Sequence, residues 1–194
     1  MGAIISSILF LPPEIPTHLH RKHYFWIQTK LGSRIPAIYI KNPKAKYTII
    51  YSHGNAEDLG KIFHYLLNIS KILNVTILAY DYTGYGLGSL PSRRSPEKTY
   101  PSEENCYADI EAAYYHLTEI EFVPPQRIIL YGRSLGSGPS CYLAQKLSRE
   151  NNKVNIAGLV LHSPFLSVCR VVVDMGFTWS TDMFPNSERI GDVR

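Results

Sequence analysis

Short apolar runs that alternate with longer amphipathic stretches place the strongest constraint on how this chain can fold. The apolar runs cover residues 47–51, 75–80, 127–131 and 156–161, and the stretches between them predict helices at 59–73, 102–120 and 135–148. This alternation is typical of βαβ units, so we expect an α/β fold whose mostly parallel sheet carries helices on both faces. Right-handed crossovers would bring the carboxyl ends of the four strands to one edge, where open α/β sheets bind ligands.

Two β-rich stretches precede these units and predict an antiparallel hairpin. They cover residues 22–29 and 34–40, and Gly32 marks the turn between them. The chain has 194 residues, of which 45% are hydrophobic, enough to bury one full core. We therefore expect one domain at 14–194, preceded by a separate segment at 1–13.

The charged and metal-binding residue types exclude several functional classes. A net charge of +4 without a run of Lys and Arg argues against nucleic acid as a partner. The three cysteines, Cys106, Cys141 and Cys169, form no C-x-x-C pair and are expected to be reduced thiols. His18, His20 and His23 lack the companion ligands of a metal site. We expect neither a metal nor an organic cofactor.

The first residues fit a lipidation pattern. Met1 to Ser6 match M-G-x-x-x-S/T, which predicts N-myristoylation of Gly2 after Met1 is removed. The apolar run that follows stops at Pro12 and is far too short to cross a bilayer. We expect segment 1–13 to contact the cytoplasmic face of a membrane without spanning it. A short apolar tail that packs on the domain is the alternative.

The pentapeptide Gly132-Arg133-Ser134-Leu135-Gly136 follows an expected strand and opens an expected helix. In this setting G-x-S-x-G is typical of a serine nucleophile, because the sharp turn projects the hydroxyl from the sheet and the helix N-terminus points amides at a developing oxyanion. Ser134 is therefore the predicted nucleophile.

The loop after the first long strand, residues 52–56, predicts the second half of an oxyanion hole. We expect the backbone N–H groups of Leu135 and Asn55 to be the two donors. His53 is better explained by packing and by hydrogen bonds within the loop than by base catalysis. Asp81, in the turn that follows the next strand, is expected to fix nearby backbone N–H groups.

These segments together resemble one family, the membrane-anchored α/β-hydrolase-domain-containing family seventeen, which are protein depalmitoylases. The resemblance is carried by SHGNAEDLG from Ser52, YDYTGYG from Tyr80, PSEENCYADIEAA from Pro101, ILYGRSLGSGPS from Ile129, LHSPFLS from Leu161 and MFPN from Met183. It implies an α/β-hydrolase fold and hydrolysis of long-chain acyl thioesters on S-palmitoylated proteins at the membrane surface. Ser134 then matches the nucleophile, and Asn55 and Leu135 match the oxyanion donors.

The sequence departs from the family in two respects. The family is tethered through N-terminal cysteines, whereas the first cysteine here is Cys106. The triad of the fold runs Ser, acid, His, but the only later histidine is His162 and the only carboxylate between it and Ser134 is Glu150. We interpret that pair as a poor triad and expect the chain to stop before the last strands, which would carry the acid and base. A carboxylester or lipid hydrolase and a noncatalytic adaptor stay open as alternatives, and so does the oligomeric state.

Apolar residues that follow the strand ends predict a groove for an acyl chain. The set comprises Tyr82, Tyr85, Phe165, Leu166, Phe177, Trp179 and Phe184. Ordinary core packing is the alternative, since aromatic side chains dominate cores as well.

Overall fold

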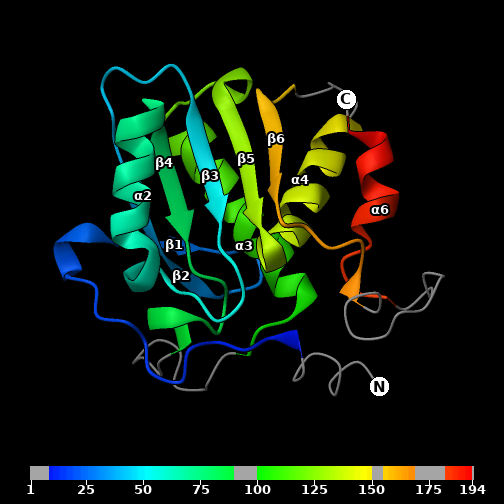
Figure 1. Cartoon of the computed structure of the whole chain (residues 1–194), viewed down its shortest axis with the longest axis horizontal. Coiled ribbons are helices and arrows are strands. Elements are labelled where there is room, and N and C mark those ends of the chain that lie inside the picture. The colour runs from blue at the N-terminus through cyan, green and yellow to red at the C-terminus, as the bar shows by residue number, and fades with distance from the viewer. Residues whose placement is uncertain (1–8, 90–99, 150–154, 169–181, 194) are drawn as a thin grey trace.

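A single mixed sheet forms the centre of the molecule, as the computed structural model shows (Figure 1). The structure describes residues 9–89, 100–149, 155–168 and 182–193. Within these residues the sheet has six strands in the order β1-β2-β4-β3-β5-β6. The strands are β1 (Phe25–Gln28), β2 (Arg34–Ile40), β3 (Thr48–Ser52), β4 (Thr76–Tyr80), β5 (Ile128–Arg133) and β6 (Gly158–His162).

Strands β3, β4, β5 and β6 run parallel, while β1 and β2 form the predicted antiparallel hairpin. The hairpin turn contains Gly32 with φ of 89°, a conformation that glycine adopts at little cost. β2 joins the parallel strands by pairing antiparallel with β4. The prediction of a mostly parallel sheet is confirmed, and the carboxyl ends of its four parallel strands share one edge.

Helices cover both faces of the sheet, which confirms that prediction too (Figure 1). Helix α2 (Leu59–Leu73) packs one face through Leu59, Ile62 and Leu66. Helices α3 (Glu103–Tyr115) and α4 (Ser137–Arg149) pack the other face. Strands β3 and β4 are buried along their whole length, as expected for strands covered on both sides.

The helix ends follow from local capping. α2 has the predicted limits, because the Asp58 side chain accepts the N–H of Lys61 at one end and Asn74 adopts a left-handed conformation at the other. Ser102 caps α3, because its side chain accepts the N–H of Asn105. The predicted helix at 102–120 changes at His116 into the π-helical turn η3 (His116–Ile120), where the Thr118 hydroxyl also donates to the carbonyl of Tyr114.

The prediction of a strand from residue 22 was wrong in its first three residues. Arg21–His23 form a short 3-10 turn, η1, because the Nδ1 atom of His20 accepts the N–H of Lys22. The remaining short elements are η2 (Gly86–Ser89), η4 (Pro125–Arg127), η5 (Ser134–Gly136), α6 (Asn186–Arg189) and η6 (Ile190–Asp192). α6 packs beside α4.

The N-terminal segment enters the core at Phe10, whose side chain is only 4% exposed. This side chain therefore belongs to the domain and does not face a membrane. Residues 1–8 lie outside the described residues, and the proposed boundary at residue 13 stays a prediction. Of the helices that the structure describes, none combines the length and apolar character needed to cross a bilayer.

Candidate active site

Ser134 lies on a sharp turn between β5 and α4, at the carboxyl edge of the parallel strands. The residue is exposed, and its φ of 49° is in the left-handed region. A non-glycine residue in this conformation costs about 1–3 kcal/mol, so the surroundings must impose it. The strand, turn and helix that G-x-S-x-G predicts are therefore present. The role of Ser134 as the nucleophile stays a prediction.

The two glycines of the pentapeptide are required by close backbone packing. A Cβ atom on Gly132 would lie 2.4 Å from the carbonyl oxygen of Gly136. A Cβ atom on Gly136 would lie 2.1 Å from the carbonyl oxygen of Ser52, at the end of β3. The turn at Ser134 thus rests directly on the neighbouring strand, which leaves no room for a side chain at either position.

The two expected oxyanion donors lie on adjacent loops. β3 and β5 are neighbours with Ser52 opposite Gly132, so the loops that carry Asn55 and Leu135 emerge side by side. Leu135 is the second residue of η5, where a backbone N–H has no carbonyl one turn earlier to bond. The backbone N–H of Asn55 makes no hydrogen bond to any residue that the structure describes. Both amides therefore remain available to a ligand, and their role stays a prediction.

A single carboxylate, that of Glu57, joins these two loops. Its Oε2 atom accepts the backbone N–H of Gly54 at 2.9 Å, and its Oε1 atom accepts the guanidinium of Arg133. Glu57 therefore connects the residue before Asn55 with the residue before Ser134. The sequence carries no signal for this bridge, because the partners are 76 residues apart and the position of Arg133 in G-x-S-x-G takes any residue type.

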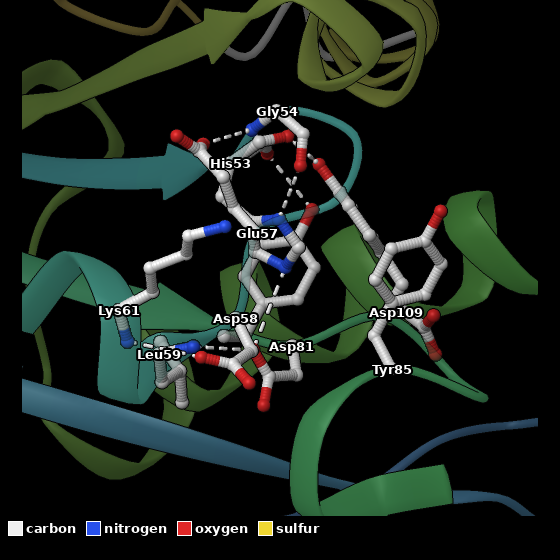
Figure 2. Close-up of polar contacts among 12 residues, drawn as sticks. His53, Gly54, Glu57, Asp58, Leu59, Lys61, Asp81, Tyr85 and Asp109 are labelled. Atoms are coloured by element: carbon white, nitrogen blue, oxygen red, sulfur yellow. Dashed lines mark hydrogen bonds and ion pairs between the residues drawn. The ribbon is translucent and has the colours of Figure 1, made fainter. Parts of the chain in front are cut away.

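His53 is fully buried beneath the loop and holds it in place (Figure 2). Its Nδ1 atom lies 2.8 Å from the carbonyl oxygen of Gly54, which can only accept, so Nδ1 carries a proton. Its Nε2 atom is 3.5 Å from Oδ1 of Asp81, which also accepts the N–H of Leu59. Burial raises the pKa of Asp81. The contacts agree with the loop-packing role predicted for His53 and the N–H-binding role predicted for Asp81.

A second buried carboxylate, Asp109 of α3, supports the turn after β4. It accepts the backbone N–H of Thr83 at 2.7 Å and the Thr83 hydroxyl at 2.8 Å. Burial raises the pKa of Asp109 to about 7. Sequence reasoning missed this pair, since an aspartate inside an expected amphipathic helix is usually solvated. Among the described residues, no cluster of His, Cys, Asp and Glu is arranged to hold a metal ion.

Comparison with known proteins identifies the family. The family described as Hydrolase_4, serine aminopeptidase S33, matches residues 43–187, which is more than half of the chain. α/β-Hydrolase domain-containing protein 17B of Homo sapiens is 34% identical over 221 aligned positions, covering 99% of this chain and 71% of the human protein. This chain belongs to the α/β-hydrolase domain-containing 17 family. Protein 17C of Xenopus tropicalis, another member, is 37% identical, covering 86% of this chain and 49% of its own length.

Solved structures confirm the fold of this family member. An α/β-hydrolase from Vibrio vulnificus superposes with a TM-score of 0.63 at 18% identity, covering 87% of this chain and 54% of that protein. An esterase from Pyrococcus furiosus superposes with a TM-score of 0.59 at 20% identity, covering 88% of this chain and 65% of that protein. At this identity the likeness shows the α/β-hydrolase fold alone. The chain thus spans about half of the length of the Vibrio enzyme.

No imidazole in the part of this family member that the structure describes is hydrogen-bonded to the Ser134 hydroxyl. His162 ends β6 directly opposite Arg133, but its Nδ1 atom lies 3.0 Å from the Tyr131 hydroxyl. Glu150 lies outside the described residues. The interpretation of Glu150 and His162 as a poor triad therefore stays a prediction.

The expected acyl groove was wrong for three of its seven residues. Tyr82, Tyr85 and Phe184 are fully buried and pack in the core, so they cannot line an open groove. Phe165 is half-buried against Phe184, and Leu166 is exposed. The other two, Phe177 and Trp179, lie outside the described residues, as do Gly2 and Cys169. Among the described residues, Cys106 and Cys141 are free and buried.

Proposed function

We propose that this chain is a serine hydrolase that cleaves long-chain acyl thioesters on S-palmitoylated proteins at the cytoplasmic face of a membrane. Membership in a hydrolase family gives the general activity. The observation that carries the proposal is Ser134 itself, exposed on a turn with φ of 49° beside the Asn55 loop. A strained, exposed serine that lies between a parallel strand and the start of a helix, beside the Asn55 loop, fits a nucleophile better than a structural turn.

The proposed chemistry passes through an acyl intermediate. The Ser134 Oγ attacks the thioester carbonyl carbon and passes its proton to a general base, which is the added imidazole in the test below, while the carbonyl oxygen takes the negative charge. The N–H groups of Asn55 and Leu135 stabilise this oxyanion. The carbon–sulfur bond then breaks, and the cysteine thiolate takes up a proton and leaves. Water attacks the acyl-Ser134 ester, releases the fatty acid and returns a proton to Ser134.

The substrate class rests on the N-terminal segment as well as on the family. Leu9 and Leu11 contact the Asn55 side chain, so the chain leads from the proposed lipid site at Gly2 directly to the proposed oxyanion loop. Seven residue-to-residue steps separate Gly2 from Leu9, and at about 3.6 Å per step they can span at most about 25 Å. A myristoyl group on Gly2 would therefore hold Ser134 close to the membrane surface, where S-acylated proteins present their thioesters.

Chemical rescue tests this function in the chain itself. Ser134 needs a proton acceptor, and none of the described imidazoles contacts it, so added imidazole should accelerate turnover of a palmitoyl-cysteine peptide. Release of free thiol is followed with and without imidazole, and mass spectrometry detects the acyl adduct. Ser134→Ala should abolish the imidazole-dependent rate above the uncatalysed reaction. Ser163→Ala is the matched control, because Ser163 is also an exposed serine with φ of 50° after a parallel strand.

Each outcome selects one function. An adduct on Ser134 with rescue of thioester turnover supports the proposal. Faster turnover of oxygen esters than of thioesters would instead identify a carboxylester or lipid hydrolase. If a folded protein forms no adduct and Ser134→Ala matches the unchanged chain at every imidazole concentration, the chain is a noncatalytic member of its family.

A further inference from the structure

The side chain of Asn55 holds the N-terminal segment on both sides of Phe10. Its Nδ2 atom donates to the carbonyl oxygen of Leu9 at 2.5 Å, and its Oδ1 atom accepts the N–H of Leu11 at 3.0 Å. The Tyr85 hydroxyl donates to the same Oδ1 atom at 2.7 Å, which fixes the amide from the other side. All these contacts leave the backbone N–H of Asn55 unoccupied.

Phe10 connects the same segment to the helix that follows Ser134. Its ring meets that of Phe184 edge to face, with centroids 6.3 Å apart. Phe184 in turn lies so close to Gly138 in α4 that a Cβ atom there would be 2.3 Å from the Phe184 ring. Tyr107 and Phe165 pack around Phe184 as well. The segment thus contacts the Asn55 loop directly and α4 through one aromatic ring.

The Asn55 loop is strained and needs such support. Ala56, the next residue, has φ of 56°, a conformation that an alanine rarely adopts alone. The Asn55 Oδ1 atom also accepts the N–H of Ala56 at 3.1 Å. One amide oxygen therefore binds the strained turn, the N-terminal segment and Tyr85 at the same time. Release of Leu9 and Leu11 would free the side chain that holds the turn.

We propose that residues 9–11 position the oxyanion loop, and that the Asn55 side chain is the positioning residue that transmits this restraint to its own backbone N–H. This inference rests on the proposed hydrolase function, because it gives the N–H of Asn55 its role. Under this proposal, the segment that leads to the proposed membrane anchor also fixes the position of an active-site donor. Detachment of that segment would then lower turnover while the substrate still binds.

A proline substitution isolates the contact. Leu11→Pro removes the N–H that Asn55 accepts, whereas Leu11→Ala keeps this N–H and shortens the same exposed side chain. Asn55→Asp is a second variant, which keeps the acceptor for Leu11 and Tyr85 but replaces the donor to Leu9. Amide hydrogen exchange across residues 53–57 reports the loop, and the imidazole-rescued thioester assay reports kcat and KM.

We expect exchange in the loop to rise about tenfold in Leu11→Pro and in Asn55→Asp, the effect of losing about one net hydrogen bond. Loop exchange in Leu11→Ala should match that of the unchanged chain, because the Leu11 N–H is kept. In Leu11→Pro and Asn55→Asp, kcat should fall about 10- to 100-fold with KM unchanged, because an oxyanion donor acts in the transition state and these variants displace it.

Two results would overturn the inference. One is equal loop exchange in Leu11→Pro and Leu11→Ala together with unchanged exchange in Asn55→Asp. The other is a loss that appears in KM alone. If loop exchange rises but the unchanged chain shows no Ser134-dependent turnover, the restraint on the loop is supported and the hydrolase function fails instead. Asn55→Asp decides the question if Leu11→Pro does not fold.

Discussion

At the scale of single residues, the turn at Ser134 depends on the absence of a side chain at Gly136. An alanine Cβ there would lie 2.1 Å from the Ser52 carbonyl oxygen, an overlap that only a backbone shift can relieve. We expect Gly136→Ala to lower the free energy of unfolding by about 2–3 kcal/mol, as overpacking does. Urea denaturation measures the change. Gly158→Ala is the control and should alter the free energy by less than about 0.5 kcal/mol, because no atom lies within 4 Å of its added Cβ. Equal losses in both variants would contradict this account.

The features of the site that the sequence predicted correctly are those whose constraints are local, such as the turn at Ser134. The glycine spacing around Ser134 signals a sharp turn without reference to the rest of the chain. Glu57 and Asp109 were missed because their partners, Arg133 and Thr83, lie far away in the sequence. Such contacts form only after the sheet has brought the loops together, and no periodicity encodes them.

At the scale of elements, Asp109 makes the stability of the contact between α3 and the turn after β4 depend on pH. In the unfolded chain its carboxyl has the ordinary pKa of 3.8, whereas in the folded chain it keeps its proton up to a pKa of about 7. The folded state therefore binds more protons between about pH 4 and 7, and its stability falls as the pH rises through this window. Asp81 shifts in the same direction. We expect Asp109→Asn to flatten this slope and to raise the stability at pH 8 above that of the unchanged chain.

The reason lies in burial. A buried carboxylate at position 109 loses its hydration when it ionises, and the N–H and hydroxyl that Thr83 donates to it offset only part of that cost. An Asn at the same position carries no charge to desolvate. Urea denaturation from pH 5 to pH 8 measures the slope for each variant. Glu104→Gln is the matched control, because Glu104 is an exposed carboxylate in the same helix. Parallel stability curves for Asp109→Asn and the unchanged chain would refute the prediction.

Element limits were predictable where capping groups are adjacent in sequence. Helix α2 has both predicted ends because Asp58 caps its start and Asn74 ends it. The first strand starts three residues late because a histidine side chain caps a short turn that competes with the extended backbone. The acyl groove failed for a related reason, since position after a strand end does not decide whether an aromatic side chain points inward or outward.

At the scale of the whole molecule, β6 is one edge of the sheet among the described residues, and β1 is the other. β6 is apolar, Val160 at its centre is 41% exposed, and a groove of about 630 Å³ runs between this strand and the C-terminal residues Ile190 and Val193. An apolar edge with unpaired backbone groups promotes pairing with another chain.

We expect concentration-dependent self-association, measured by sedimentation velocity, and we expect Val160→Lys to reduce it. Trp26→Lys, an exposed position on β1, is the control and should leave it unchanged. A chain that stays monomeric at every concentration, or equal effects of the two lysines, would show that β6 does not drive association.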